Sequence, residues 1–300
     1  MNNIFSLLII SSILLVLISV NRKLRQRNTW KKPIKPFPAS WRKTLYENVI
    51  FYNNLEPEEK KRFENKVQEF LINITISGVE TEVNEYDRVL VAASAIIPIF
   101  AFPDWQYFNL KEVLLYPGLF NEQFGTNGEK RSIAGMVGTG YMEGKMIMSK
   151  QALHHGFRNE SDKKNTAIHE FVHLIDKADG NIDGIPSLLL EKQYTIPWLD
   201  LIKKKIEENY EGESDINPYG ATDKTEFFAV ISEYFFERPK LLQQKHPELY
   251  KLLERIFARK CLKSLKELLH LRLTEKIPVL VVAEKSIKYA AVNCKLDCYE

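Results

Sequence analysis

Residues 169–173 read His-Glu-Phe-Val-His, and this stretch carries more chemistry than any other part of the 300-residue chain. On an α-helix, the four-residue spacing places His169 and His173 on one face, where both imidazoles can bind a single zinc ion. Glu170 can then reach a water molecule on that ion and act as its general base. The pattern predicts a zinc hydrolase with one Zn²⁺ per chain.

A five-residue pattern also arises by chance, so the competing interpretation is an ordinary helix that happens to carry two histidines. The neighbouring residues favour the metal. Apolar side chains interleave with the histidines and predict a buried helix, namely Ile168, Phe171, Val172, Leu174 and Ile175. Burying two histidines and a glutamate is costly unless something compensates them, and a metal ion does so.

A catalytic zinc ion usually has three protein ligands and one open position, so a third ligand must be found. Asp179, six residues after the second histidine, would complete a short arrangement, but that arrangement needs a glycine where Asp176 stands. Glu226 is the better candidate, because it lies with Glu233 on one face of an apolar helix, where buried acids need partners. Glu233 is then structural or supports a ligand. Asp176 either holds a ligand imidazole or caps the end of the motif helix.

Residues 4–20 form a run of 17 residues without a charge, at the short end of what spans a bilayer as a helix. A cleaved signal peptide is the competing interpretation, but no basic residue precedes the run and no small-residue cleavage motif follows it. Nine Lys or Arg and no acid lie between Arg22 and Lys43, and such charge tends to stay on the cytoplasmic side. We therefore expect a transmembrane anchor at 1–21, a basic, proline-containing linker at 22–43 and a cytoplasmic catalytic domain.

The charge of the chain is unevenly distributed. It has 42 Lys or Arg and 39 Asp or Glu; without the nine basic residues of the linker, 33 and 39 remain, a net charge of −6. This mildly acidic remainder argues against a nucleic-acid partner, whereas the basic linker suits anionic lipid headgroups. The three cysteines, Cys261, Cys294 and Cys298, fit a reducing compartment better than a disulfide framework.

The remaining patterns predict an α+β fold with a small sheet and a mostly helical remainder. Strand-like runs at 112–116 and 144–149 enclose glycine-rich turns, which predict a hairpin, and 278–283 is a possible last strand. The segment 112–149 should also include an edge strand that pairs with an extended substrate. Helical patterns occupy residues 41–52, 57–71, 87–100, 165–177, 196–209, 224–236 and 241–273. The adjacent His154 and His155 are expected to be exposed in a loop.

Three segments together resemble the Mlc titration factor A family of zinc peptidases: HEFVHLID at 169–176, DGNIDGIP at 179–186 and YGATDKTEFFAV at 219–230. The stretches 88–95 and 113–120 also fit. That family is similar in structure to the catalytic domain of anthrax lethal factor. The N-terminal anchor and the tail after about Leu262 do not match the family pattern.

The resemblance implies that His169, His173 and Glu226 bind zinc and that Glu170 is the general base. It also places Tyr219 where its phenol could stabilise the oxyanion. The implied fold is a zincin-like metallopeptidase domain of the gluzincin type, which we assign to residues 44–265, followed by a C-terminal extension of unknown role at 266–300. The implied function is peptidase activity with aminopeptidase-like cleavage of small substrates, together with binding to a sugar-responsive transcriptional repressor.

Two functions are therefore in competition. The first is a membrane-tethered zinc peptidase acting on a peptide or protein substrate. The second is a regulatory protein that sequesters a transcriptional repressor at the membrane, with zinc stabilising its fold. A structural zinc site is usually closed by four protein ligands and needs no glutamate beside the first histidine, so the sequence favours catalysis.

Overall fold

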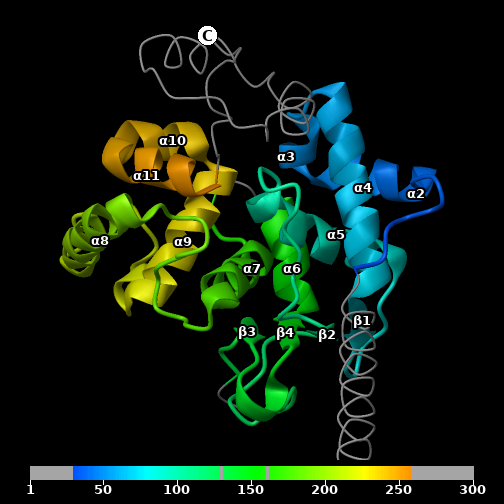
Figure 1. The fold of residues 1–300 in the computed structure, drawn as a ribbon. Helices are drawn as coiled ribbons and strands as arrows, with labels where there is room; N and C mark the ends of the chain where they lie inside the picture. The colour runs from blue at the N-terminus through cyan, green and yellow to red at the C-terminus, as the bar shows by residue number, and fades with distance from the viewer. Residues whose placement is uncertain (1–29, 129–130, 160–161, 258–300) are drawn as a thin grey trace, which may run out of the picture.

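The computed structural model describes residues 30–128, 131–159 and 162–257, in which a four-stranded sheet lies at one end of the molecule and most helices lie to one side of it (Figure 1). The strands lie in the order β1 (Thr75–Gly78), β2 (Glu112–Tyr116), β4 (Lys145–Ser149) and β3 (Gly135–Val137). The first three are parallel, whereas β3 runs antiparallel to β4 and lies at the edge of the sheet. The α+β class is therefore as predicted.

The predicted hairpin between residues 112–116 and 144–149 is wrong, because β2 and β4 are parallel neighbours. Parallel strands need a long connection, and here the glycine-rich segment between them supplies it. That segment also contributes β3, which forms the actual hairpin with β4. Strand β1 was not predicted, because its four residues are too short to show a clear alternation.

The N-terminal helices lie on one side of the molecule (Figure 1). They are α2 (Ala39–Asn48), α3 (Ile50–Asn53), α4 (Pro57–Asn73) and α5 (Glu85–Ile96). Helix α4 begins with Pro57, where the helix was expected to begin, because the N–H group of the first helical residue has no partner within the helix. Helix α5 continues into a short 3₁₀ helix at Ile97–Ile99, so the apolar run ends close to where it was expected to end.

Residues 30–38 contain no helix or strand and lie along α4. The backbone N–H of Lys31 donates to Asn73 Oδ1 at 2.7 Å, and Gln68 Nε2 donates to the carbonyl of Lys35 at 3.1 Å. The first described helix, α2, begins at Ala39, inside the range 22–43 that was predicted as linker. Residues 30–36 therefore pack along α4 of the domain.

The remaining helices follow the sheet in sequence. They are α6 (Lys150–Arg158), α7 (Thr166–Asp176), α8 (Thr195–Tyr210), α9 (Lys224–Glu237), α10 (Pro239–Lys245) and α11 (Pro247–Phe257). Helix α7 packs against α9 on one side and against α5, α6 and the edge strand β3 on others. The single helix predicted at 241–273 is wrong in its described part, because Pro247 has no N–H to continue α10 and starts α11 instead.

Several sequence predictions lie outside the described residues. They are the transmembrane anchor at 1–21, the first part of the linker, the three cysteines, the strand at 278–283 and the extension at 266–300. Within residues 30–128, 131–159 and 162–257, no helix combines the length and the apolar character needed to cross a bilayer.

Candidate metal centre

Helix α7 carries the His-Glu-x-x-His pattern and is buried almost throughout. Asn165 caps its first turn, because its side-chain oxygen accepts a hydrogen bond from the backbone N–H of Ile168 at 3.1 Å. Both motif histidines and the glutamate between them are at most 8% exposed. Polar side chains at such depth need partners, and α9 supplies them.

Helix α9 brings two acids to α7. Its cap is Asp223, whose carboxylate accepts hydrogen bonds from the backbone N–H groups of Thr225 and Glu226. Glu226 lies in the first turn of α9 and Glu233 lies two turns later, so both carboxylates project from the same face. That face is the one that contacts α7.

Three side chains meet between the two helices. Nε2 of His169 lies 3.0 Å from Nε2 of His173 and 3.0 Å from Oε2 of Glu226, and the His173 nitrogen lies 3.6 Å from the same oxygen. One ligand atom from each residue thus falls within 4.8 Å of the other two. Two imidazole nitrogens and one carboxylate oxygen at this separation can bind one metal ion.

The electrostatics of the cluster favour a cation. Burial lowers the pKa of His169, but hydrogen bonds to the carboxylates of Glu226 and Glu233 raise it well above its ordinary value. Burial raises the pKa of Glu226, but hydrogen bonds from His169 and His173 hold it well below its ordinary value. The two carboxylates therefore stabilise positive charge at this point, whether a proton or a metal ion carries it.

Glu233 supports the cluster from the other side of His169. Its Oε1 lies 2.8 Å from His169 Nδ1, and its Oε2 accepts a hydrogen bond from the backbone N–H of Asn165. With Nδ1 donating to Glu233, Nε2 of His169 is the nitrogen that faces the cluster, where it donates to Glu226 when protonated and could bind a metal ion when deprotonated. Of the two roles left open for Glu233, the geometry favours support of a ligand.

Glu170 lies beside the cluster but does not belong to it. Burial raises the pKa of its carboxyl group, which shifts a potential general base toward neutral pH. Gly135 of β3 lies against this carboxylate: a Cβ atom built on Gly135 would be 2.5 Å from Glu170 Oε1. The sequence predicted Gly135 as part of a turn, and only the packing of α7 on β3 reveals why a side chain is missing there.

Tyr219 lies beside His169 and is partly exposed to solvent. It belongs to the 3₁₀ helix Pro218–Ala221, its residue is 53% exposed, and its ring centroid lies 6.1 Å from that of His169. Partial burial, followed by the negative charge of Glu226, raises the pKa of the Tyr219 phenol to about 12. The hydroxyl therefore keeps its proton at neutral pH and can donate a hydrogen bond.

The competing third ligand, Asp179, does not join the cluster. Its Oδ1 accepts from the backbone N–H of Asn181 in the turn that follows α7. Asp176 anchors the same loop, because its Oδ2 accepts from the backbone N–H of Gly184 at 2.8 Å. Asp176 Oδ1 and His173 Nδ1 are both buried without a hydrogen-bond partner among the described residues. Of the two predicted roles of Asp176, the one at the end of the helix is supported by a hydrogen bond between described residues.

His154 and His155 were expected in a loop, and this prediction is wrong, because both residues belong to α6. His154 Nε2 lies 2.6 Å from Oδ1 of the fully buried Asp87, which also receives Lys150 Nζ at 2.8 Å. This contact ties α6 to the start of α5. His155 is exposed, as predicted, with its side chain 58% accessible.

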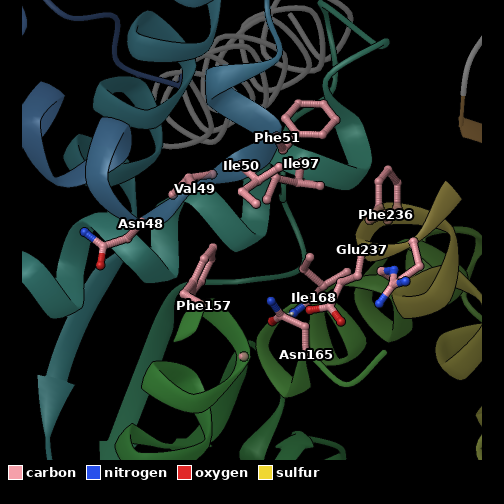
Figure 2. Close-up of a pocket in the computed structure, with 12 residues that line it drawn as sticks. Asn48, Val49, Ile50, Phe51, Ile97, Phe157, Asn165, Ile168, Phe236 and Glu237 are labelled. Carbon is pink, nitrogen blue, oxygen red and sulfur yellow. Dashed lines mark hydrogen bonds between the residues drawn. The ribbon is translucent and has the colours of Figure 1, made fainter. Parts of the chain in front are cut away.

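A cavity of about 330 Å³ lies beside the N-terminal end of α7 (Figure 2). Its walls include Asn165 and Ile168 of α7, Phe157 of α6 and Phe236 of α9. His169, His173 and Glu226 are not among its lining residues, so this cavity is separate from the metal cluster.

Comparison with known proteins relates this arrangement to a family. The model of a family described as glucose-regulated metallo-peptidase M90 matches residues 21–258. This span includes α7, α9 and the 3₁₀ helix Pro218–Ala221, and therefore every residue predicted for the site.

Individual proteins with similar sequences share 30% identity or less with this chain in the three examples that follow. The uncharacterised protein slr2042 of Synechocystis sp. is 28% identical over 244 residues, which is 77% of this chain and 86% of that protein. Mlc titration factor A of Pectobacterium atrosepticum is 30% identical over 169 residues, covering 52% of this chain and 62% of that protein. The protein of the same name from Escherichia fergusonii is 27% identical over 214 residues, 66% of this chain and 78% of the relative.

Proposed function

Because the chain belongs to the glucose-regulated metallo-peptidase M90 family, we propose that it is a zinc-dependent peptidase whose ion is held by His169, His173 and Glu226. The resemblance to Mlc titration factor A is confirmed by several relatives of that name. The observation that carries the proposal is the convergence of the three ligand atoms within 4.8 Å of one another.

The donor set suits zinc. Two imidazoles and one carboxylate leave a fourth position open, which is the usual composition of a catalytic zinc site, and the glutamate from a later helix makes it a gluzincin-type site. When bound, zinc lowers the pKa of a water molecule and polarises a carbonyl group. Glu233 holds the ring of His169 in the tautomer that leaves Nε2 free to bind.

Glu170 is the proposed general base. It follows the first ligand on α7, is 5% exposed and has a pKa raised by burial. In the proposed mechanism its carboxylate takes a proton from the attacking water and returns it to the nitrogen of the leaving amine. The phenol of Tyr219, which is protonated at neutral pH, donates a hydrogen bond to the developing negative charge on the carbonyl oxygen.

The free edge of strand β3 is an argument for a peptide substrate. The carbonyl of Ala134 and the N–H of Gly138 bond to β4, so the N–H and C=O groups of the intervening Gly135 and Val137 point away from the sheet. An extended peptide can pair with these groups as an added strand, next to Glu170. Aminopeptidase-like cleavage of small substrates, which the family resemblance implies, is part of the proposal.

We also propose the location predicted from the sequence: a single anchor at 1–21, the domain at 44–265 on the cytoplasmic side and an extension at 266–300. The uncharged run and the basic residues that follow it support this arrangement. A periplasmic reporter fused after Lys43 should stay inactive. An active reporter would overturn the cytoplasmic assignment.

The names of the relatives favour a second function. Mlc titration factor A is named for titrating Mlc, so the alternative proposal is that this chain binds a transcriptional repressor, with zinc being structural. In that case Glu170 has no chemical task. The two functions can coexist, and a substitution of Glu170 separates them.

The decisive experiment is Glu170→Gln, measured for zinc content, hydrolysis of amino-acid p-nitroanilides and internally quenched peptides, and repressor binding. We expect zinc to be retained and hydrolysis to fall by about 10²–10⁴-fold. Hydrolysis at the wild-type rate would refute the proposed role of Glu170. Glu226→Ala should lose zinc, whereas Asp179→Ala, the matched control from the competing arrangement, should retain it.

A further inference from the structure

We propose that the surface formed by residues 30–36, Ile72 and Phe108, here named the collar surface, lies on an anionic lipid bilayer. The inference goes beyond peptidase activity and uses the proposed N-terminal anchor only to bring this surface near a membrane. It concerns residues that the structure describes, at the end of the domain where the described chain begins.

The collar surface is continuous. Trp30 meets Phe108 edge to face, with ring centroids 6.1 Å apart. The next residue, Lys31, exchanges two hydrogen bonds with Asn73 at 2.7 and 2.8 Å. Gln68, which lies one turn before Ile72 on the same face of α4, donates to the carbonyl of Lys35 at 3.1 Å. Residues 30–36 are thus held in place along the helix rather than free of it.

Apolar side chains on this surface face water. Ile34 is 99% exposed, Phe108 is 63% exposed and Ile72 is 42% exposed. A monomeric protein seldom gathers large apolar side chains in this way unless they meet a partner. Tryptophan and phenylalanine beside exposed aliphatic groups are typical of the interface between headgroups and acyl chains.

The same surface is positively charged. Lys31, Lys32 and Lys35 are exposed, and residues 30–36 contain no acid. The nearby Glu69 of α4 is 8% exposed and lies 3.6 Å from Lys66. Each lysine near an anionic bilayer strengthens binding by about fivefold, so the three act together with the apolar groups.

The composition of the segment favours lipid over a protein strand or a nucleic acid. Pro33 and Pro36 have no N–H group, so residues 30–36 are a poor template for an added β-strand. A fully exposed isoleucine gains nothing from a phosphate backbone, whereas it can enter the acyl region below anionic headgroups. An uncharged run at residues 4–20 also precedes this surface in the chain.

The test uses the full chain with Cys261, Cys294 and Cys298 replaced by serine and one new cysteine, either Ile34→Cys or the control Tyr210→Cys. Tyr210 is 84% exposed and ends α8, which lies across the molecule from α2 and α4 (Figure 1). Each variant is mixed with phosphatidylcholine vesicles, with or without about a third of phosphatidylglycerol. Flotation then reports association, and a membrane-impermeant maleimide reports access to the thiol.

We expect both variants to float with both kinds of vesicle, and the cysteine at position 34 to react at least about tenfold more slowly than the control on the anionic vesicles. The charge reversal K31E/K32E/K35E should restore its reaction rate. Equal reaction of the two cysteines on floating protein would overturn the collar surface while leaving the anchor intact.

The proposed anchor and the proposed role of the collar surface can be refuted independently of each other. Flotation only with anionic vesicles, abolished by K31E/K32E/K35E, would support the surface and overturn the anchor. No flotation with either vesicle would overturn both. Slow reaction of the cysteine at position 34 without vesicles, growing with protein concentration, would assign the surface to a second copy of the chain and overturn the lipid proposal.

Discussion

Replacing Gly135 with alanine should disable the proposed general base while leaving the metal ligands in place. A Cβ atom on Gly135 would lie 2.5 Å from Oε1 and 2.6 Å from Cγ of Glu170, whereas ordinary contact begins at 3.4 Å. The carboxylate must therefore move by about 0.9 Å, the difference between 3.4 and 2.5 Å. Gly135 is not among the residues with a positive φ angle, so backbone strain does not contribute.

The expected loss follows from this displacement. A catalytic group that is misplaced by about 1 Å can cost about 10²-fold in rate. We therefore expect kcat/KM of Gly135→Ala to fall by about 10²-fold, equivalent to about 2.7 kcal/mol in the activation barrier. The zinc content should not change, because the three atoms nearest to the new methyl group all belong to Glu170 and none belongs to His169, His173 or Glu226.

The assay is hydrolysis of an internally quenched peptide, with zinc measured by elemental analysis on the same sample. Gly118→Ala is the matched control, since a Cβ atom there meets only Gln151 Oε1 at 3.5 Å. In a Glu170→Ala background the Cγ, Cδ and Oε1 atoms that the new methyl group would meet are absent, so adding Gly135→Ala should lower the residual activity by less than about tenfold. Wild-type activity of Gly135→Ala, or an undiminished further loss in the Glu170→Ala background, would refute the reasoning.

Three further predictions concern the metal and the pH dependence of stability. Glu233→Gln should weaken zinc binding by about 10–100-fold in competition with a chromophoric chelator, because the carboxylate that orients His169 is lost; unchanged affinity would make Glu233 purely structural. Removing the metal should lower the melting temperature, and zinc at about 1,000 times its Kd should raise the free energy of unfolding again by about 4 kcal/mol. Identical melting curves with and without zinc would contradict a metal site formed by the folded chain. Burial raises the pKa of Asp215, but hydrogen bonds from His246, Tyr234 and two lysines hold it well below its ordinary value. Since the folded pKa is below the unfolded value of about 3.9, this stabilisation is present above that pH and is lost as the pH falls below it. In urea unfolding, Asp215→Asn should therefore be less stable than the wild type at pH 7, and the difference should shrink below about pH 4; a difference that stays constant with pH would be inconsistent with this ionic network.

Features that depend on neighbouring residues could be predicted from the sequence. The motif helix was expected at 165–177 and α7 spans Thr166–Asp176, because its cap and its apolar periodicity are local properties. The same holds for α9, expected at 224–236 and found at Lys224–Glu237. Glu226 could be named because an acid in an apolar helix needs a partner, which is an argument about burial and not about topology.

Features that depend on distant contacts could not be predicted. Gly135 looked like a turn residue, and its close approach to Glu170 exists only because β3 packs against α7. His154 looked like an exposed loop residue, and its partner Asp87 is 67 residues away in the chain. The parallel pairing of β2 and β4 likewise reflects which strands are neighbours in the sheet, and local periodicity contains no such information.

By itself, the sequence determined the chemistry available to this protein. Two histidines one helical turn apart, a glutamate between them and two acids on a second apolar helix define a donor set, because residue type and helical periodicity are local. Only the tertiary structure decided how that set is used. Packing of α7 against α9 brings Glu226 to both imidazoles and Glu233 behind His169, and packing of α7 against β3 places Glu170 beside an open strand edge. These contacts join residues that are far apart in the chain, 57 and 64 positions for the two contacts to α9 and 35 for Gly135 and Glu170. Burial of the shared core selects them from among the many pairings that the separate helices and strands would allow.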